Sequence, residues 1–294
     1  EGVTWVDHSA ILSYEQIIRL VRLAASLGVE KVRLTGGEPL VRKGLASLVE
    51  ELKSIGGIHT VSLTTNGVLL AEQLPDLLKA GLDGVNLSLD TLDRAQFASL
   101  TRRDELPRAL EGLEATLAAP GLTVKVNCVP SGGNDAQLVP LAALARDRDL
   151  TVRFIELMPI GLGDTLTRRT EEEVLRQLEE AFGPALPCPS DSLGGPSRNV
   201  TFQGFQGKVG FISAVSHQFC QRCNRVRLTA TGFLKTCLQY DHGVDLKALL
   251  DAGAEDAALL EAMADAINHK PASHHFGGQR EAADEGRNMN QIGG

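Results

Sequence analysis

Residues 31–40 read KVRLTGGEPL, a short strand pattern that ends in a Thr-Gly-Gly-Glu-Pro turn. Other β-rich runs occur near 59–65, 84–89, 122–129 and 151–157, and longer stretches with helical periodicity separate them. This alternation predicts repeated βα units with right-handed crossovers. The result is a parallel sheet that is either open and doubly wound or part of a barrel.

The ends of the first three strands favour one of these architectures. They carry TGGEP at 35–39, TTNG at 64–67 and NLSLD at 86–90, which are polar or contain glycine. Barrel enzymes place their chemistry at the carboxyl ends of their strands. We therefore expect an α/β fold built on a partial barrel.

Helices are expected between the strands. The clearest spans 14–27, because Ser13 and Gln16 form a capping-box pattern and Gly28 suits a helix C-terminus. Further helices are expected near 43–55, 68–80, 92–118 and 135–148.

The pattern changes after Met158 and Pro159. A helix near 170–182 precedes a linker rich in proline, glycine and serine, which is followed by hairpin-like sequence from 200 to 238 and an alanine-rich helix near 255–268. We expect three segments, namely a partial barrel over 1–165, a helix and linker over 166–198, and a second structural unit over 199–294.

The composition excludes several classes of protein. A net charge of −8 over 294 residues gives no overall basic field for nucleic acid. No window reaches the roughly 18 apolar residues that a membrane helix needs, and the N-terminus lacks the regions of a signal peptide. We expect a cytoplasmic protein with neither a nucleic-acid nor a membrane partner.

Three of the five cysteines, Cys220, Cys223 and Cys237, lie close together in the sequence. Their spacing suits a turn that presents two thiolates and a hairpin strand that returns the third, which favours a metal or cluster site over disulfides. On spacing alone, a zinc site completed by His217 or His242 and an iron-sulfur cluster are equally compatible.

Several polar residues occupy positions typical of a ligand site. Arg225 and Arg227 alternate after the cysteine turn and can face a phosphate, although a solvated strand face explains either residue alone. Arg33 and Lys125 lie inside strand patterns, where a barrel directs them inward and a surface edge is the alternative. Gly37 leaves backbone groups open to a ligand, although an ordinary βα turn is the simpler explanation.

Other candidates are ambiguous by themselves. Thr64 and Ser88 are hydroxyls at strand ends and can cap the following helix. Met158 before a proline is typical of core packing. Cys128 and Cys188 are assigned to packing or the surface.

Together these motifs resemble a known family. TGGEPL, TTNG, NLSLDTL, FIELMPIG, FCQRCNRVRLTATGFLKTCL and the terminal NMNQIGG are similar to the molybdenum cofactor biosynthesis protein A family, the GTP 3′,8-cyclases of the radical S-adenosylmethionine (SAM) superfamily. The resemblance covers essentially the whole chain. Its most specific part is CNRVRL with a third cysteine and a C-terminal double glycine. It favours a cluster over zinc.

The resemblance implies a partial (β/α)6 TIM-like barrel of the radical SAM type, closed at its lower edge by a C-terminal region with a [4Fe-4S] cluster. This cluster would be held by Cys220, Cys223 and Cys237, with one iron left open. Implied GTP contacts are Arg33, Thr64, Lys125, Arg225, Val226 and Arg227. Implied SAM contacts are Gly37, Ser88 and Met158. The implied tail, which inserts toward the active site, ends in Gly293 and Gly294.

The family also has a first cluster, whose ligands form a Cys-x3-Cys-x2-Cys loop after the first barrel strand. The sequence contains no such motif, and EGVTWVDHSAILSYEQ resembles the stretch that follows that loop. We therefore expect the first strand and its three ligands to lie upstream of Glu1, two clusters in the intact protein, and no activity from the 294-residue chain alone.

The implied reaction is the SAM-dependent cyclisation of GTP to (8S)-3′,8-cyclo-7,8-dihydroguanosine 5′-triphosphate, the first step of molybdenum cofactor biosynthesis. Implied partners are GTP, a reductant protein and, by pathway, cyclic pyranopterin monophosphate synthase, and a homodimer is compatible. Two other functions remain open, a radical SAM peptide-modifying enzyme with an auxiliary cluster and a non-catalytic, zinc-stabilised nucleotide-binding protein.

Overall fold

The computed structural model describes residues 6–189, 195–276, 278, 281, 284–287, 289 and 292. Over these residues the main sheet has the strand order β1-β2-β3-β4-β5-β8-β7-β6. The strands from β1 to β8 in this order are parallel, and β7 and β6 are added by antiparallel pairing. The strands are β1 Lys31–Leu34, β2 Thr60–Thr65, β3 Gly84–Ser88, β4 Thr123–Cys128, β5 Thr151–Ile155, β6 Leu186–Cys188, β7 Arg198–Thr201 and β8 Lys208–Ile212.

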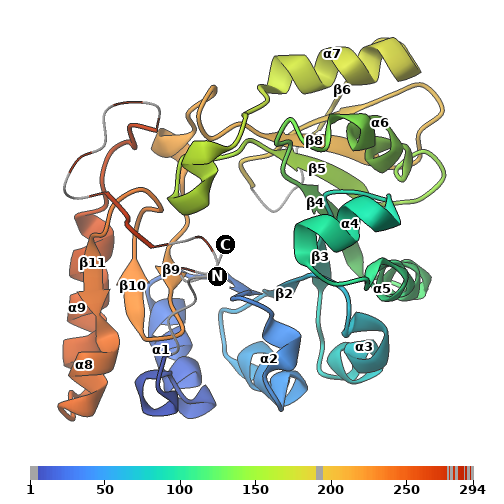
Figure 1. The fold of residues 1–294 in the computed structure, drawn as a ribbon. Helices are drawn as coiled ribbons and strands as arrows, with labels where there is room; N and C mark the ends of the chain where they lie inside the picture. The colour runs from blue at the N-terminus through green and yellow to red at the C-terminus, as the bar shows by residue number, and fades with distance from the viewer. Residues whose placement is uncertain are drawn as a thin grey trace.

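Helices cover the outer side of this sheet. Figure 1 shows the strands along an arc with α2, α3, α5, α6 and α7 outside it, which is the arrangement of a partial barrel and confirms the expected fold class. The helices are α1 Tyr14–Ser26, α2 Leu45–Ser54, α3 Leu70–Lys79, α4 Arg94–Thr101, α5 Leu106–Ala118, α6 Asp135–Ala143 and α7 Glu171–Phe182.

A smaller unit follows the barrel. It contains the antiparallel strands β9 Arg227–Leu228, β10 Phe233–Lys235 and β11 Gly243–Asp245 and the helices α8 Leu246–Asp251 and α9 Asp256–Asn268. Helix α9 packs against α1, where Arg19 Nε lies 2.7 Å from Asp256 Oδ1 and Arg19 Nη2 donates to the Ala254 carbonyl at 2.9 Å. These contacts fix the small unit to the start of the barrel.

The two faces of the parallel strands differ in chemistry. One face is apolar and packs under the helices, with Val61, Leu63, Val126 and Val152 fully buried in the main core. The residues that alternate with them are polar, as in Ser62 and the positions near it along β2, and they point to the inner side of the arc. Parallel strands are usually apolar on both faces. A polar inner face therefore indicates that this side contacts a ligand.

Local signals in the sequence explain most helix boundaries. The capping box of Ser13 and Gln16 is present, and Gly28 after α1 has a φ of 89°. The single helix expected over 92–118 was wrong, because the chain forms α4 and α5 there. Arg102 ends α4 in the left-handed region with a φ of 59°, where a helix cannot continue.

The main sheet continues past the boundary expected near residue 198. Strand β8 pairs with β5, and β7 and β6 extend the sheet, so the first hairpin of the expected second unit belongs to the barrel sheet. The expected linker also contains β6, whose short pairing with β7 is not visible in the sequence pattern. No helix of the described residues is long and apolar enough to cross a membrane.

Candidate active site

Polar residues from four neighbouring strands form one row on the inner face. Thr64 of β2 lies in register with Asn86 of β3, which is opposite Lys125 of β4, and Lys125 is opposite Thr151 of β5. Arg33 of β1 pairs with Ser62, on the same face as Thr64. The sheet thus places Arg33, Thr64 and Lys125 on one surface.

Three arginines gather at the edge of this surface. Desolvation, followed by the charge of Arg225, lowers the pKa of Arg33, although part of its side chain reaches solvent. Desolvation, followed by the charges of Arg225 and Arg33, lowers the pKa of Arg227 to about 10. Arg225 and Arg227 come from the turn before β9 and from β9 itself, so residues almost 200 positions apart meet here. Crowded guanidinium groups repel one another, and a polyanion relieves this repulsion.

The cysteine turn lies directly before these arginines. Cys220 to Arg222 form one turn of 3₁₀ helix, in which the Cys223 amide donates to the Cys220 carbonyl at 3.0 Å. Burial and then the charges of Cys237, Glu281, Asp284 and Cys220 raise the pKa of Tyr240, so Cys220 and Cys237 both lie near that ring. The fold therefore brings the third cysteine back toward the first two.

Lys270, just after α9, holds the same turn. Its Nζ donates to the carbonyls of Cys223 and Arg225, each at 2.8 Å, and lies 3.4 Å from Cys223 Sγ. Burial raises the pKa of the Cys223 thiol, but the Arg225 backbone and the charges of Arg225 and Lys270 outweigh it, so that the pKa falls below its ordinary value. A lowered pKa favours the thiolate, the form that binds a metal. The sequence offered no signal for Lys270.

His217 is not placed to complete a Cys3His zinc site with the three cysteines. Cys220, Cys223 and Cys237 are free and half-buried. His217 faces α7 instead of the thiols, with its Nε2 3.3 Å from Glu172 Oε1 and its Nδ1 3.8 Å from Glu171 Oε2. No three His, Cys, Asp or Glu side chains of the described residues form a ready metal-binding group.

The glycine-rich loop after β1 is tied to the loop after β2. Glu38 Oε1 accepts from Thr65 Oγ1 at 2.8 Å, and its Oε2 accepts from the Asn66 amide at 2.8 Å. Gly37 lies in this loop directly before Glu38, and a Cβ atom added at Gly37 would meet nothing within 4 Å. The backbone at Gly37 is therefore open to a ligand on a loop that Glu38 holds rigid.

The sequence analysis did not single out Arg153 or Asn127, which lie close to Ser88. Arg153 of β5 is 6% exposed, and its Nη2 donates to Asn86 Oδ1 at 2.5 Å while its Nε donates to Asn127 Oδ1 at 2.9 Å. Asn127 lies in register with Ser88. A buried guanidinium needs hydrogen-bond partners, and the two asparagines provide them on the inner face. The alternation of Val152, Arg153 and Phe154 was the available clue.

Other candidate residues lie around the cysteine turn or outside the described part. The Val226 side chain packs on the apolar core of the small unit. Met158 packs with Ile292, which is fully buried, and the Ile292 carbonyl accepts from Arg227 Nη1 at 3.0 Å. Gly293 and Gly294 lie outside the described residues, but the residue before them touches the arginine group.

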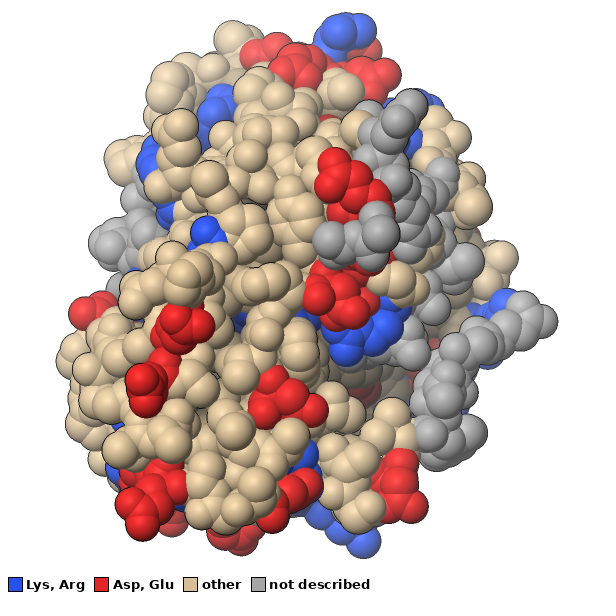
Figure 2. Space-filling model, turned by 90° about the vertical axis from the view of Figure 1, so that its left-hand side faces the viewer, with Lys and Arg blue, Asp and Glu red and all other residues tan. Residues whose placement is uncertain are grey.

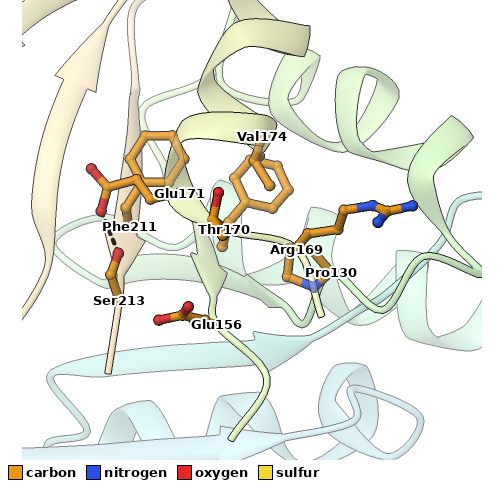
Figure 3. A pocket seen from close by; sticks show the side chains of 9 residues that line it. Pro130, Glu156, Arg169, Thr170, Glu171, Val174, Phe211 and Ser213 are labelled. Carbon is orange, nitrogen blue, oxygen red and sulfur yellow. Dashed lines mark hydrogen bonds between the residues drawn. The ribbon is translucent and has the colours of Figure 1, made fainter. Parts of the chain in front are cut away.

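A small, partly open pocket lies at the carboxyl ends of β5 and β8 beside the start of α7. Figure 3 shows Glu156 and Glu171 among its lining residues, with Ser213 hydrogen-bonded to Glu171. Glu156 Oε2 also accepts from the Val215 and Ser216 amides at 2.8 and 2.9 Å. Two carboxylates make this cavity unsuitable for a triphosphate, and Glu156 instead supports the loop that leads to Cys220.

The parallel partial barrel with a polar inner face and a cysteine turn at its edge has the features of a radical SAM protein. The chain matches the family models "Radical SAM superfamily" over residues 4–145 and "Molybdenum Cofactor Synthesis C" over residues 150–276. These two matches meet close to the end of α6.

Relatives match along the entire chain. The "GTP 3′,8-cyclase" of Moorella thermoacetica is 43% identical over 297 residues, covering 100% of this chain and 90% of the relative, and that of Heliobacterium modesticaldum is 44% identical over 302 residues with the same coverage. Among solved structures, a domain of a pyruvate-formate lyase-activating enzyme from Bacteroides vulgatus is 15% identical, with a TM-score of 0.41 over 51% of this chain and 90% of that one. The chain belongs to the GTP 3′,8-cyclase family within the radical SAM superfamily.

Proposed function

We propose that this chain carries the GTP-binding part of a radical SAM enzyme that cyclises GTP to 3′,8-cyclo-7,8-dihydro-GTP in molybdenum cofactor biosynthesis. The observation that carries the proposal is the meeting of Arg33, Arg225 and Arg227 beside a turn with two of three clustered cysteines. A triphosphate carries several negative charges, which converging guanidinium groups bind well.

The residues divide into two groups along the inner face. Arg33, Lys125, Arg225 and Arg227 would bind the triphosphate, and Thr64 and the Val226 backbone would contact the rest of the nucleotide. At the ends of β1, β3 and β5, the open backbone of Gly37, the Ser88 hydroxyl and Met158 would hold SAM. Arg153 would orient this end of the site through Asn86 and Asn127.

The chemistry requires both ligands to be held close together. SAM, when bound and reduced by one electron, supplies the radical that removes the 3′ hydrogen of GTP. The C3′–C8 bond then forms within GTP, and one electron from a reductant and one proton complete the 7,8-dihydro product. The part of this chain is to fix the two ligands in register and exclude water from the reacting carbons.

The cysteines would hold one [4Fe-4S] cluster, with GTP as the ligand of its open iron. The cluster that cleaves SAM needs a Cys-x3-Cys-x2-Cys loop, which the 294-residue sequence does not contain. We therefore propose that these 294 residues alone bind GTP but do not cleave SAM. Adding a strand followed by such a loop at the N-terminus would supply the second cluster.

The test joins such an N-terminal segment to the chain and incubates the protein without oxygen with SAM, a reductant and GTP labelled with deuterium at C3′. We expect deuterium in 5′-deoxyadenosine and a cyclised nucleotide. A protein that holds two clusters and binds both ligands without giving this product would instead be a peptide-modifying enzyme. A colourless protein that contains zinc would support the non-catalytic nucleotide-binding alternative.

A further inference from the structure

The C-terminal segment returns to the strand that leads to Cys237. Lys235 ends β10, two residues before Cys237, and Glu285 lies on the C-terminal segment. Lys235 Nζ donates a hydrogen bond to Glu285 Oε2, and both side chains are only 1% exposed. Removing either charge would leave the other buried without this direct partner, which is unfavourable.

Further hydrogen bonds satisfy this pair. Lys235 Nζ also donates to the Tyr240 carbonyl at 2.8 Å. Arg287 Nε donates to Glu285 Oε1 at 2.8 Å, and Arg287 Nη2 donates to Glu285 Oε2 at 2.9 Å. The Glu285 amide donates to the Gln239 carbonyl at 2.6 Å. Glu285 is thus bound through its backbone and through both carboxylate oxygens.

The contact extends on both sides of Glu285. Tyr240 and Asp284 form an antiparallel bridge, and Gln239 Nε2 donates to Asp284 Oδ1 at 3.2 Å. Arg287 Nη2 also donates to Asp241 Oδ1 at 2.8 Å. Residues 284–287 therefore lie along 239–241, the stretch that follows Cys237.

The segment then reaches the arginine group. Ile292 is fully buried against Ile160 and Phe276, and its carbonyl accepts from Arg227 Nη1 at 3.0 Å. Two anchors thus hold the C-terminal segment, one beside Cys237 and one at Arg227.

We propose that Lys235 and Glu285 are positioning residues that fix the C-terminal segment against the Cys237 stretch and so set where the chain meets Arg227. We call the Lys235–Glu285 pair with Arg287 and Asp241 the tail clamp. Well-packed apolar residues are often at least as stabilising as a buried ion pair. The use of two buried charges instead fits a requirement for one defined position of the segment.

The effect of the clamp on GTP rests on the proposed function, but the clamp itself does not. The test uses Lys235→Met in the 294-residue chain, reconstituted with iron and sulfide without oxygen. Hydrogen exchange of the C-terminal peptide is measured by mass spectrometry, together with GTP affinity and iron content. Lys247→Met is the matched control. Lys247 lies on α8, where its Nζ is 2.6 Å from Asp251 Oδ2 of the same helix, and it takes no part in the clamp.

Lys235→Met should speed exchange of the C-terminal peptide about tenfold or more, leave peptides of β2 to β5 unchanged, and weaken GTP binding about tenfold at unchanged iron content. Lys247→Met should change none of these. If Lys235→Met loses protection throughout the barrel, Glu285→Gln decides, since it removes the anion without opening a cavity.

The proposal is overturned if the C-terminal peptide of Glu285→Gln exchanges as slowly as in the unmodified chain. It is also overturned if the peptide is released while GTP affinity stays the same. Failure of the unmodified chain to bind GTP would instead contradict the proposed function. The hydrogen-exchange result would then still decide whether the clamp fixes the C-terminal segment.

Discussion

Replacing Arg33 by Gln should make the protein more stable in the absence of ligand and weaken its binding of GTP. Desolvation, followed by the charges of Arg225 and Arg33, lowers the pKa of Arg227 from its ordinary value to about 10. At about 1.4 kcal/mol per pH unit, this corresponds to roughly 3 kcal/mol of destabilisation by Arg227 in the ligand-free fold. Desolvation is the largest cause, so removal of the Arg33 charge should restore about 0.5 to 1 kcal/mol.

The assay is thermal unfolding with and without GTP. For a chain of this size, Arg33→Gln should raise the midpoint by about 1 to 3 °C without GTP. It should lower the GTP affinity about tenfold to a hundredfold, since a charge-assisted contact contributes about 1.5 to 3 kcal/mol. Arg148→Gln is the control, because Arg148 pairs at the surface with Glu114 and its loss should be nearly neutral.

The pH dependence of this difference has a definite sign. A cation whose folded pKa lies below its unfolded pKa destabilises the fold fully at pH values below the folded pKa, here about 10, and the destabilisation disappears as the pH rises from about 10 toward the unfolded pKa. The gain from Arg33→Gln should therefore be constant near neutral pH and shrink above pH 10. A variant that is less stable without GTP and binds GTP normally would refute the reasoning and return Arg33 to a solvated edge.

Further predictions concern the cluster, its turn and the core. Serine at Cys220, Cys223 or Cys237 should bleach the protein, and full iron content in all three variants would disprove the ligand assignment. Lys270→Met should release the Cys223 turn and weaken GTP binding about tenfold, whereas unchanged affinity would make Lys270 irrelevant. Gly112→Ala should destabilise the fold by about 1 to 3 kcal/mol in denaturant unfolding, because its Cβ would lie 2.6 Å from the Gly67 carbonyl oxygen. Alanine at exposed Gly133, where the same Cβ meets nothing, is its control.

The barrel could be predicted from the sequence because its signals are local. Each expected strand from 31 to 157 is present within a residue or two, since short β-rich runs between helical stretches need no distant information. The break between α4 and α5 could not be read from hydrophobic periodicity, because it depends on the left-handed Arg102. Strand β6 depends on pairing with β7, which only the folded chain provides.

The candidate site was predictable in part. The spacing of the cysteines and the charged positions in strands indicated which residue types gather, and the structure places Arg33, Arg225 and Arg227 together. Lys270 and Glu285 could not be found this way, because their partners lie 47 and 50 positions away and neither residue belongs to a recognisable motif. Long-range polar contacts of this kind follow from tertiary packing alone.

The central claim is that GTP binds at the cluster held by the three cysteines, and electron paramagnetic resonance of the reduced 294-residue chain tests it most directly. Figure 2 shows charges of both signs interspersed over the described residues of one face. Because that face is not uniformly basic, we expect GTP to bind specifically at the arginine group. After anaerobic reconstitution we predict about four irons per chain and a spectrum that changes on addition of GTP but not of ATP, with the change lost in Arg227→Gln. A chain that takes up zinc instead of iron, or a cluster spectrum that GTP leaves unaltered, would contradict the account.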